Sequence, residues 1–172
     1  MASPPRTRTY HVFQRTLVGL IIVLLAVLAV IGWFHEPEQP ETFGLTLTAC
    51  QFLEPEGGDR GYTRGDKNDC REINARTASE RLAEARVFTL EPGRYRIRVT
   101  NRDVDAKLGF WLREEDYDFG NPFDVMHRTS VSASGLAKGE TMRFTLKLEA
   151  GTYLYSDPVN PTPDYKLVVE SE

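Results

Sequence analysis

The sequence predicts a mainly β protein in which one β-sandwich follows a single transmembrane α-helix. Three observations lead to this prediction. An uncharged apolar run lies near the N-terminus, short β-rich segments separated by turn residues fill the C-terminal half, and helix-forming sequence is scarce there. The 172 residues therefore divide near residue 35 into two parts of different chemistry.

The apolar run is "LVGLIIVLLAVLAVIGWF", residues 17–34, which contains no charged residue. At about 1.5 Å per residue, a helix of this length spans roughly 27 Å, close to the ~30 Å hydrocarbon core of a bilayer. Trp33 and Phe34 stand where aromatic residues anchor a helix at the membrane interface, and Arg15 precedes the run. These features predict a transmembrane helix over 17–34.

Charge predicts the orientation of this helix. Residues 1–34 contain three arginines and no acidic residue, so 35–172 carries 18 basic and 25 acidic residues, a net 18 − 25 = −7. The positive-inside rule then places the basic tail, 1–16, in the cytoplasm and 35–172 outside. A cleaved signal peptide is the rival interpretation, but such segments are usually shorter and end in small residues, unlike "IGWFHEPE".

The outer part begins with a Pro/Glu linker, 35–41, and we expect one domain over 42–172. "FGLTLTACQFL" alternates as a half-buried strand does. "EPEGGDRGYTRGDKNDC" is rich in Gly and Asp and predicts a loop. "TASERLAEARVF" predicts a short helix before Val87.

From residue 86 onward the pattern is β. "RVFTLEPGRYRIRVTNRD" predicts two strands joined by a turn at 91–93. In the second strand an apolar face alternates with a cationic one: Tyr95, Ile97 and Val99 against Arg94, Arg96 and Arg98. We interpret the arginines as a solvated face, with an acidic partner as the alternative. Further strands are predicted in "KLGFWLRE", "TSVSASGLAKGETMRFTLKLEAGTYLYS" and "YKLVVE", and an irregular segment in "EDYDFGNPFDVMH".

Cys50 and Cys70 bracket the predicted loop. Disulfides persist outside the cytoplasm, and closing a loop of this size stabilises a fold by roughly 3 kcal/mol in the chain-entropy model. We therefore predict a Cys50–Cys70 disulfide.

Three stretches resemble the cupredoxins, which are Greek-key β-sandwiches that commonly hold one copper. They are "LEPGRYRIRVTNRD", "LAKGETMRFTLKLEAGTYLY" and "DPVNPTPDYKLVVE", and the resemblance covers about residues 42–170. It implies a mainly β, Greek-key, cupredoxin-like sandwich for the outer domain.

The same resemblance assigns positions to the copper ligands, and this sequence has other residues there. A blue-copper centre needs two imidazoles and a thiolate. The positions that resemblance assigns to them hold Leu108, Asp157 and Thr162. We therefore expect no copper and no other cofactor. A hard cation held by Asp157, Asn160 and Asp164 is the alternative; such residues more often cap turns.

Catalytic motifs are lacking, so we expect no enzyme activity, and an acidic outer domain disfavours nucleic acid as a partner. What remains is surface. "REEDYDFGNPFDVMH" mixes acidic residues with four candidate docking residues: Tyr117, Phe119, Phe123 and Met126. The alternative is that these side chains plug the open end of the sandwich.

The leading hypothesis is a non-catalytic, single-pass accessory subunit of a bacterial inner-membrane complex, such as one of respiratory or photosynthetic electron transfer. Its partners would be other subunits of that complex and the lipid bilayer, and its outer domain would lie in the periplasm. Two alternatives stay open: a membrane-tethered electron-transfer or copper-handling protein, and a periplasmic sensing or ligand-binding module.

Overall fold

The computed structural model describes residues 17–27 and 39–171. The chain forms two compact units, Met1–Glu38 and Gln39–Glu172. In the first unit, residues 17–27 are helical and exposed. Across the described residues, no helix is both long and apolar enough to cross a membrane. The remainder of the predicted span, with Trp33 and Phe34, lies outside the described residues, as do Arg15 and the basic tail.

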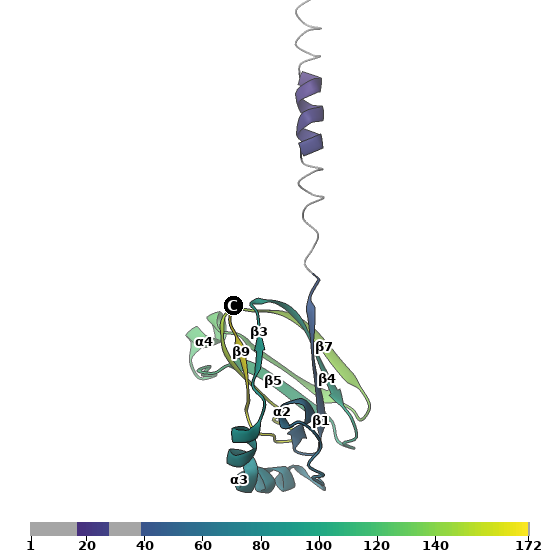
Figure 1. The fold of residues 1–172 in the computed structure, drawn as a ribbon, viewed down its shortest axis with the longest axis vertical. Coiled ribbons are helices and arrows are strands. Elements are labelled where there is room, and N and C mark those ends of the chain that lie inside the picture. Colours follow the sequence, from purple (N-terminus) through teal and green to yellow (C-terminus); the bar gives the residue numbers. More distant parts are fainter. Residues whose placement is uncertain (1–16, 28–38, 172) are drawn as a thin grey trace, which may run out of the picture. The chain divides into compact units, whose positions relative to one another are not determined.

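The second unit is a sandwich of two sheets (Figure 1). The first sheet has the strand order β2-β1-β4-β7 and the second the order β3-β9-β8-β5-β6. The strands are β1 (Glu41–Thr48), β2 (Gln51–Phe52), β3 (Phe88–Leu90), β4 (Gly93–Asn101), β5 (Leu108–Glu114), β6 (Ser130–Leu136), β7 (Thr141–Leu148), β8 (Gly151–Ser156) and β9 (Tyr165–Val169). The helices are α2 (Leu53–Glu56), α3 (Lys67–Glu84) and α4 (Pro122–His127). The predicted mainly β sandwich is confirmed.

The alternation in β4 decides which of its faces enters the core. Tyr95, Ile97 and Val99 are buried, whereas the three arginines between them are exposed. β4 pairs in parallel with β1 and antiparallel with β7. The predicted turn at 91–93 does not make a hairpin, because β3 pairs with β9 in the other sheet. That turn therefore carries the chain from one sheet to the other.

Two aromatic clusters from opposite sheets meet in the core. Phe52, from the first sheet, makes edge-to-face contacts with Phe110, Tyr155 and Tyr165 of the second. Such contacts add roughly 0.5–1.5 kcal/mol per pair to the burial of apolar area. The contacts of Phe52 therefore join the inner faces of the two sheets.

The longest helix was not expected from the sequence. α3 has 18 residues and begins at Lys67, inside the segment predicted to be loop; the predicted helix began ten positions later, at Thr77. The loop predicted for residues 54–70 is confirmed for 57–66 but wrong at its two ends, where residues 54–56 belong to α2 and residues 67–70 to α3. The start of α3 was missed because "GDKND" is a capping sequence. The Asp66 side chain accepts a hydrogen bond from the Asn68 N–H (2.5 Å), and the Asp69 side chain accepts one from the Asp66 N–H (3.0 Å). This reciprocal box satisfies the first free N–H groups of the helix.

A second correction concerns residues 115–127, predicted to be irregular throughout. They contain the six-residue helix α4. Asn121 caps it by accepting a hydrogen bond from the Phe123 N–H at 3.0 Å, and Pro122 occupies the first turn, where its missing N–H costs nothing.

Helix α3 is fixed to the sandwich by polar and covalent links. Only Cys70 and Arg81 of its residues are buried. The predicted disulfide between Cys50 and Cys70 is confirmed, and it ties the start of α3 to the turn after β1.

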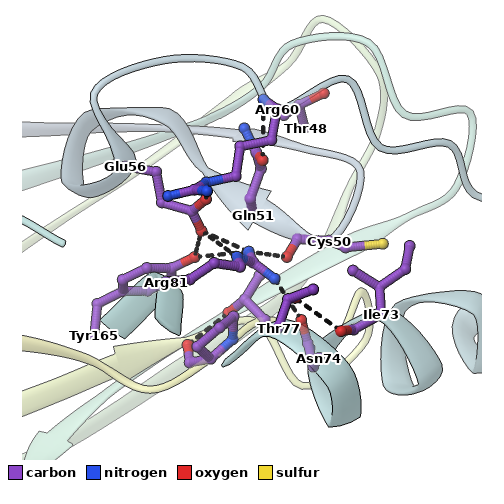
Figure 2. A network of polar contacts seen from close by, with 12 residues as sticks. Thr48, Cys50, Gln51, Glu56, Arg60, Ile73, Asn74, Thr77, Arg81 and Tyr165 are labelled. Carbon is purple, nitrogen blue, oxygen red and sulfur yellow. Dashed lines mark hydrogen bonds and ion pairs between the residues drawn. The ribbon is translucent and has the colours of Figure 1, made fainter. Parts of the chain in front are cut away.

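Arg81 fixes the other end of the helix, as Figure 2 shows. Its guanidinium donates to Glu56 Oε1 (2.9 and 2.5 Å), to the carbonyl oxygen of Cys50 (2.9 Å) and to Asn74 Oδ1 (2.7 Å). The hydroxyl of Tyr165 also donates to Glu56. Arg81 and the Glu56 side chain are almost fully buried. α2, α3 and β9 therefore meet at one ion pair.

Arg81→Leu should lower the free energy of unfolding by about 3 kcal/mol, because it leaves the Glu56 carboxylate buried with fewer partners. The double variant Arg81→Leu/Glu56→Leu should lose clearly less than the sum of the two single losses. Urea unfolding followed by circular dichroism measures all three values. Arg76→Leu, at an exposed position of the same helix, is the control and should change stability by less than about 0.5 kcal/mol. Additive losses in the double variant would contradict the buried pair.

Candidate functional site

The structure brings together the three positions at which the resemblance placed copper ligands. Asp157 follows β8, and Leu108 opens β5, the neighbouring strand in the second sheet. The Gly109 N–H donates to Asp157 Oδ1 at 3.0 Å. Thr162 Oγ1 accepts a hydrogen bond from the Asp157 N–H, also at 3.0 Å. Leu108 itself is fully buried in the core.

At this place the Asp157 carboxylate links backbone segments. Its Oδ1 also accepts a hydrogen bond from the Val159 N–H at 2.7 Å. Gly109 permits the close approach, because a Cβ there would lie 3.2 Å from Asp157 Oδ1 and 3.0 Å from the Val159 side chain. The carboxylate therefore joins the beginning of β5 to the turn after β8.

Burial controls the ionisation of this carboxyl group. Asp157 is 1% exposed, and its Oδ2 has no hydrogen-bond partner among the described residues. Desolvation raises the pKa of Asp157 to about 6, although N–H donors from Asn160, Val159 and Gly109 favour the charged form. The site therefore holds a carboxyl group that changes charge near neutral pH.

The two other candidate oxygen donors are engaged by protein groups. Asn160 is fully buried; its Oδ1 accepts from the Cys50 N–H (3.1 Å) and its Nδ2 donates to the Thr48 carbonyl oxygen (3.0 Å). Asp164 pairs with Arg113 at 2.7 Å. Within the described part of the chain, no group of three or more His, Cys, Asp and Glu side chains is arranged to hold a metal ion.

Asn160 has a role that the sequence did not reveal. Cys50 has a positive φ of 63°, and the Asn160 amide holds this turn through the backbone groups on both sides of Ala49, the Thr48 carbonyl oxygen and the Cys50 N–H. The same turn carries the disulfide to α3. "NP" before the last strand predicted a turn, but no local signal could name a partner 110 residues away in the chain.

Residues 117–126 place apolar side chains on the surface. Phe119 is 79% exposed, Phe123 65% and Met126 77%, and Val125, which the sequence analysis did not single out, is 52% exposed. These four residues are called the α4 apolar cluster below. Tyr117 is different, because it is half-buried with its ring edge-on to Trp111. The alternative that these side chains plug the end of the sandwich fails for Phe119, Phe123 and Met126.

Helix α4 buries a polar residue and exposes its apolar ones, unlike an ordinary surface helix. Its one buried residue is Asp124, whose carboxylate accepts hydrogen bonds from the Asp118 N–H (2.9 Å) and Asn121 Nδ2 (3.2 Å) and lies 3.4 Å from Arg128 Nε. A surface helix normally turns its apolar residues inward. Here the polar anchor, Asp124, is inside and the α4 apolar cluster is outside.

This cluster lies at the end of the sandwich where β1 begins (Figure 1). The Glu115 N–H donates to the Thr152 carbonyl oxygen at 2.9 Å, which places the loop that leads to α4 beside the start of β8. β8 follows directly on β7, whose last residue, Leu148, pairs with the first residue of β4, Gly93. β1 enters beside that start of β4.

No family model matches this sequence, and no curated protein matches it. Among solved structures, auracyanin B matches with a TM-score of 0.46 and 15% identity over 79% of this chain and 94% of that protein. Auracyanin A from Chloroflexus aurantiacus, described as a "blue" copper protein, matches with a TM-score of 0.42 and 19% identity, over 77% of this chain and 100% of that protein. Auracyanin from Roseiflexus castenholzii matches with a TM-score of 0.41 and 12% identity, over 76% of this chain and 97% of that protein. At these identities and TM-scores, the matches support no conclusion about copper binding or electron transfer in this chain.

Asp157→Asn should make the protein increasingly more stable than the wild type as the pH rises from about 4 to about 6. The folded-state pKa lies above the unfolded value, so ionisation destabilises the folded state within this window, by up to about 3 kcal/mol for a shift of roughly two units. Urea unfolding of both proteins across this pH range measures the difference, in which the other titrating groups cancel.

Asp69→Asn provides a control of opposite sign. Hydrogen bonds from the Asp66 and Gly65 N–H groups lower the pKa of Asp69, so this variant should become less stable than the wild type as the pH rises through the acidic range. A difference between the wild type and Asp157→Asn that does not change with pH would contradict the buried, titrating carboxyl group.

Proposed function

We propose that this chain is a non-catalytic accessory subunit of a bacterial membrane protein complex and that its sandwich docks on the other subunits outside the cytoplasm. The observation that carries the proposal is the α4 apolar cluster. Aromatic and methionine side chains are enriched in the buried centres of protein interfaces, and an exposed cluster of them is costly in water unless a partner covers it.

The geometry around Asp157 supports an accessory rather than a redox role. A copper centre of the blue type requires soft and imidazole ligands, and Leu108, Asp157 and Thr162 supply none. The oxygen atoms present are used to hold backbone groups together. On this proposal the region around Asp157, at the other end of β8 from α4, acts as a structural link within the domain.

Anchoring by residues 17–34 completes the proposal. This run is apolar throughout and follows a basic tail, which supports a single-pass inner-membrane helix with the N-terminus in the cytoplasm. β1, the first element after the linker, begins at the same end of the sandwich as the α4 apolar cluster. The Cys50–Cys70 disulfide supports placing the domain in the oxidising periplasm.

The test is purification of the tagged full-length chain from its native membranes in a mild detergent. We expect it to elute with other membrane subunits in fixed ratio and without copper bound to this chain. A free monomer would contradict the proposal, and a monomer with one equivalent of copper would favour an electron-transfer or copper-handling protein.

Phe123→Ser/Met126→Ser should weaken the association with these subunits about tenfold or more, because on this proposal the two side chains are central anchors of the interface, the minority of contacts whose truncation costs over about 1 kcal/mol each. Co-purification yield at matched expression measures the loss. Leu82→Ser/Val87→Ser changes two exposed apolar residues far from α4 in the sequence and should leave the association unchanged. Equal losses in the two double variants would contradict docking through the α4 apolar cluster.

A further inference from the structure

The outer face of the first sheet carries a flat array of cations. Arg94, Arg96 and Arg98 project from β4, and Arg143 and Lys147 project from the adjacent β7; all five are exposed. These five residues are called the cationic sheet face. The sequence pattern indicates only the three arginines of β4, because the pairing of β4 with β7 brings the other two residues beside them.

This face contains no acidic residue of its own. The other outward positions of its strands are Gly44 and threonines: Thr42, Thr46, Thr100, Thr141 and Thr145. Among residues 39–171, no carboxylate lies within ion-pair distance of Arg94, Arg96, Arg98 or Arg143, and Lys147 pairs only with Glu149, which follows the strand (3.0 Å). The five charges are therefore almost uncompensated within the domain.

The arrangement is unfavourable for the isolated sheet. Arg94 stands directly opposite Lys147, and Arg98 directly opposite Arg143. Like charges in directly opposed positions destabilise a pair of strands. The cationic sheet face differs in charge from the rest of the domain: residues 35–172 carry a net charge of −7, which leaves −7 − 5 = −12 outside the face. A partner with carboxylates would relieve the repulsion.

We infer that the cationic sheet face binds an acidic surface of a partner protein. This inference rests on the proposed function and specifies the chemistry of one partner surface. Arginine guanidinium groups bind carboxylates through two parallel hydrogen bonds, and a rigid sheet holds them at fixed spacing. Surface binding to a membrane combines cations with apolar side chains that enter the headgroup layer, whereas threonine and glycine fill the remaining positions here.

The test uses the full-length chain in neutral detergent and a fluorescent oligoglutamate peptide as the probe, followed by anisotropy at low and high salt. The wild type should bind the peptide, and added salt should weaken binding. Arg94→Gln/Arg96→Gln/Arg98→Gln should weaken it about tenfold, because it removes three exposed pairs of modest strength. Thermal unfolding of each variant verifies that it is folded.

Arg71→Gln/Arg76→Gln/Lys107→Gln is the matched control, since it removes three exposed positive charges outside the face. It should weaken binding less than threefold. Equal losses in the two triple variants would show a net-charge effect and overturn the inference. So would binding that prefers phosphatidylglycerol over phosphatidylcholine vesicles and is lost in Arg94→Gln/Arg96→Gln/Arg98→Gln, or salt-sensitive self-association that depends on the three arginines.

The two proposals can fail separately. A wild-type chain that co-purifies in a fixed ratio with membrane subunits but does not bind oligoglutamate through these arginines would overturn only the inference. A chain that binds the peptide as expected but is a free monomer in native membranes would overturn the proposed function.

Discussion

The buried ion pair between Arg81 and Glu56 fixes the helices α2 and α3 to each other and to the β-sandwich. Desolvating a guanidinium and a carboxylate is expensive, and only close geometry with further hydrogen bonds offsets the cost. Here the hydroxyl of Tyr165, the Asn74 amide and the Cys50 carbonyl supply those bonds. Because the partners come from α2, α3, β9 and the turn after β1, the pair fixes how the long helix is placed against the sheets.

That turn connects two otherwise separate regions. The carbonyl oxygen of Cys50 accepts a hydrogen bond from Arg81, its N–H donates to Asn160, and its sulfur forms the disulfide. Asn160 belongs to the same short loop as Asp157, whose carboxylate binds the start of β5. The region where the resemblance placed copper ligands is thus continuous, through one turn, with the links that hold α3. Polar side chains there are used for structure, and this leaves the surfaces as the regions available for recognition.

Two surfaces of different chemistry remain. The α4 apolar cluster is apolar, sits at one end of the sandwich and is held outward by the buried Asp124. The cationic sheet face is flat, charged and built on two long paired strands. Apolar clusters supply buried area, and charged faces supply orientation and speed of encounter. On the proposed function, a subunit that bridges neighbours would use both.

Local sequence patterns predict the features that depend on neighbours in the chain. Alternation of apolar and polar residues predicted β4 and its two faces, turn residues separated the strands, and the spacing of Cys50 and Cys70 predicted their disulfide. The capping box at Asp66 is also a local signal, although the Gly and Asp residues around it predict a loop. The folded domain alone reveals the pairing of β3 with β9, the partners of Arg81, the burial of Asp157 and the union of β4 and β7 into one cationic face. These depend on contacts between residues far apart in the chain, and local propensity carries no information about such distant partners.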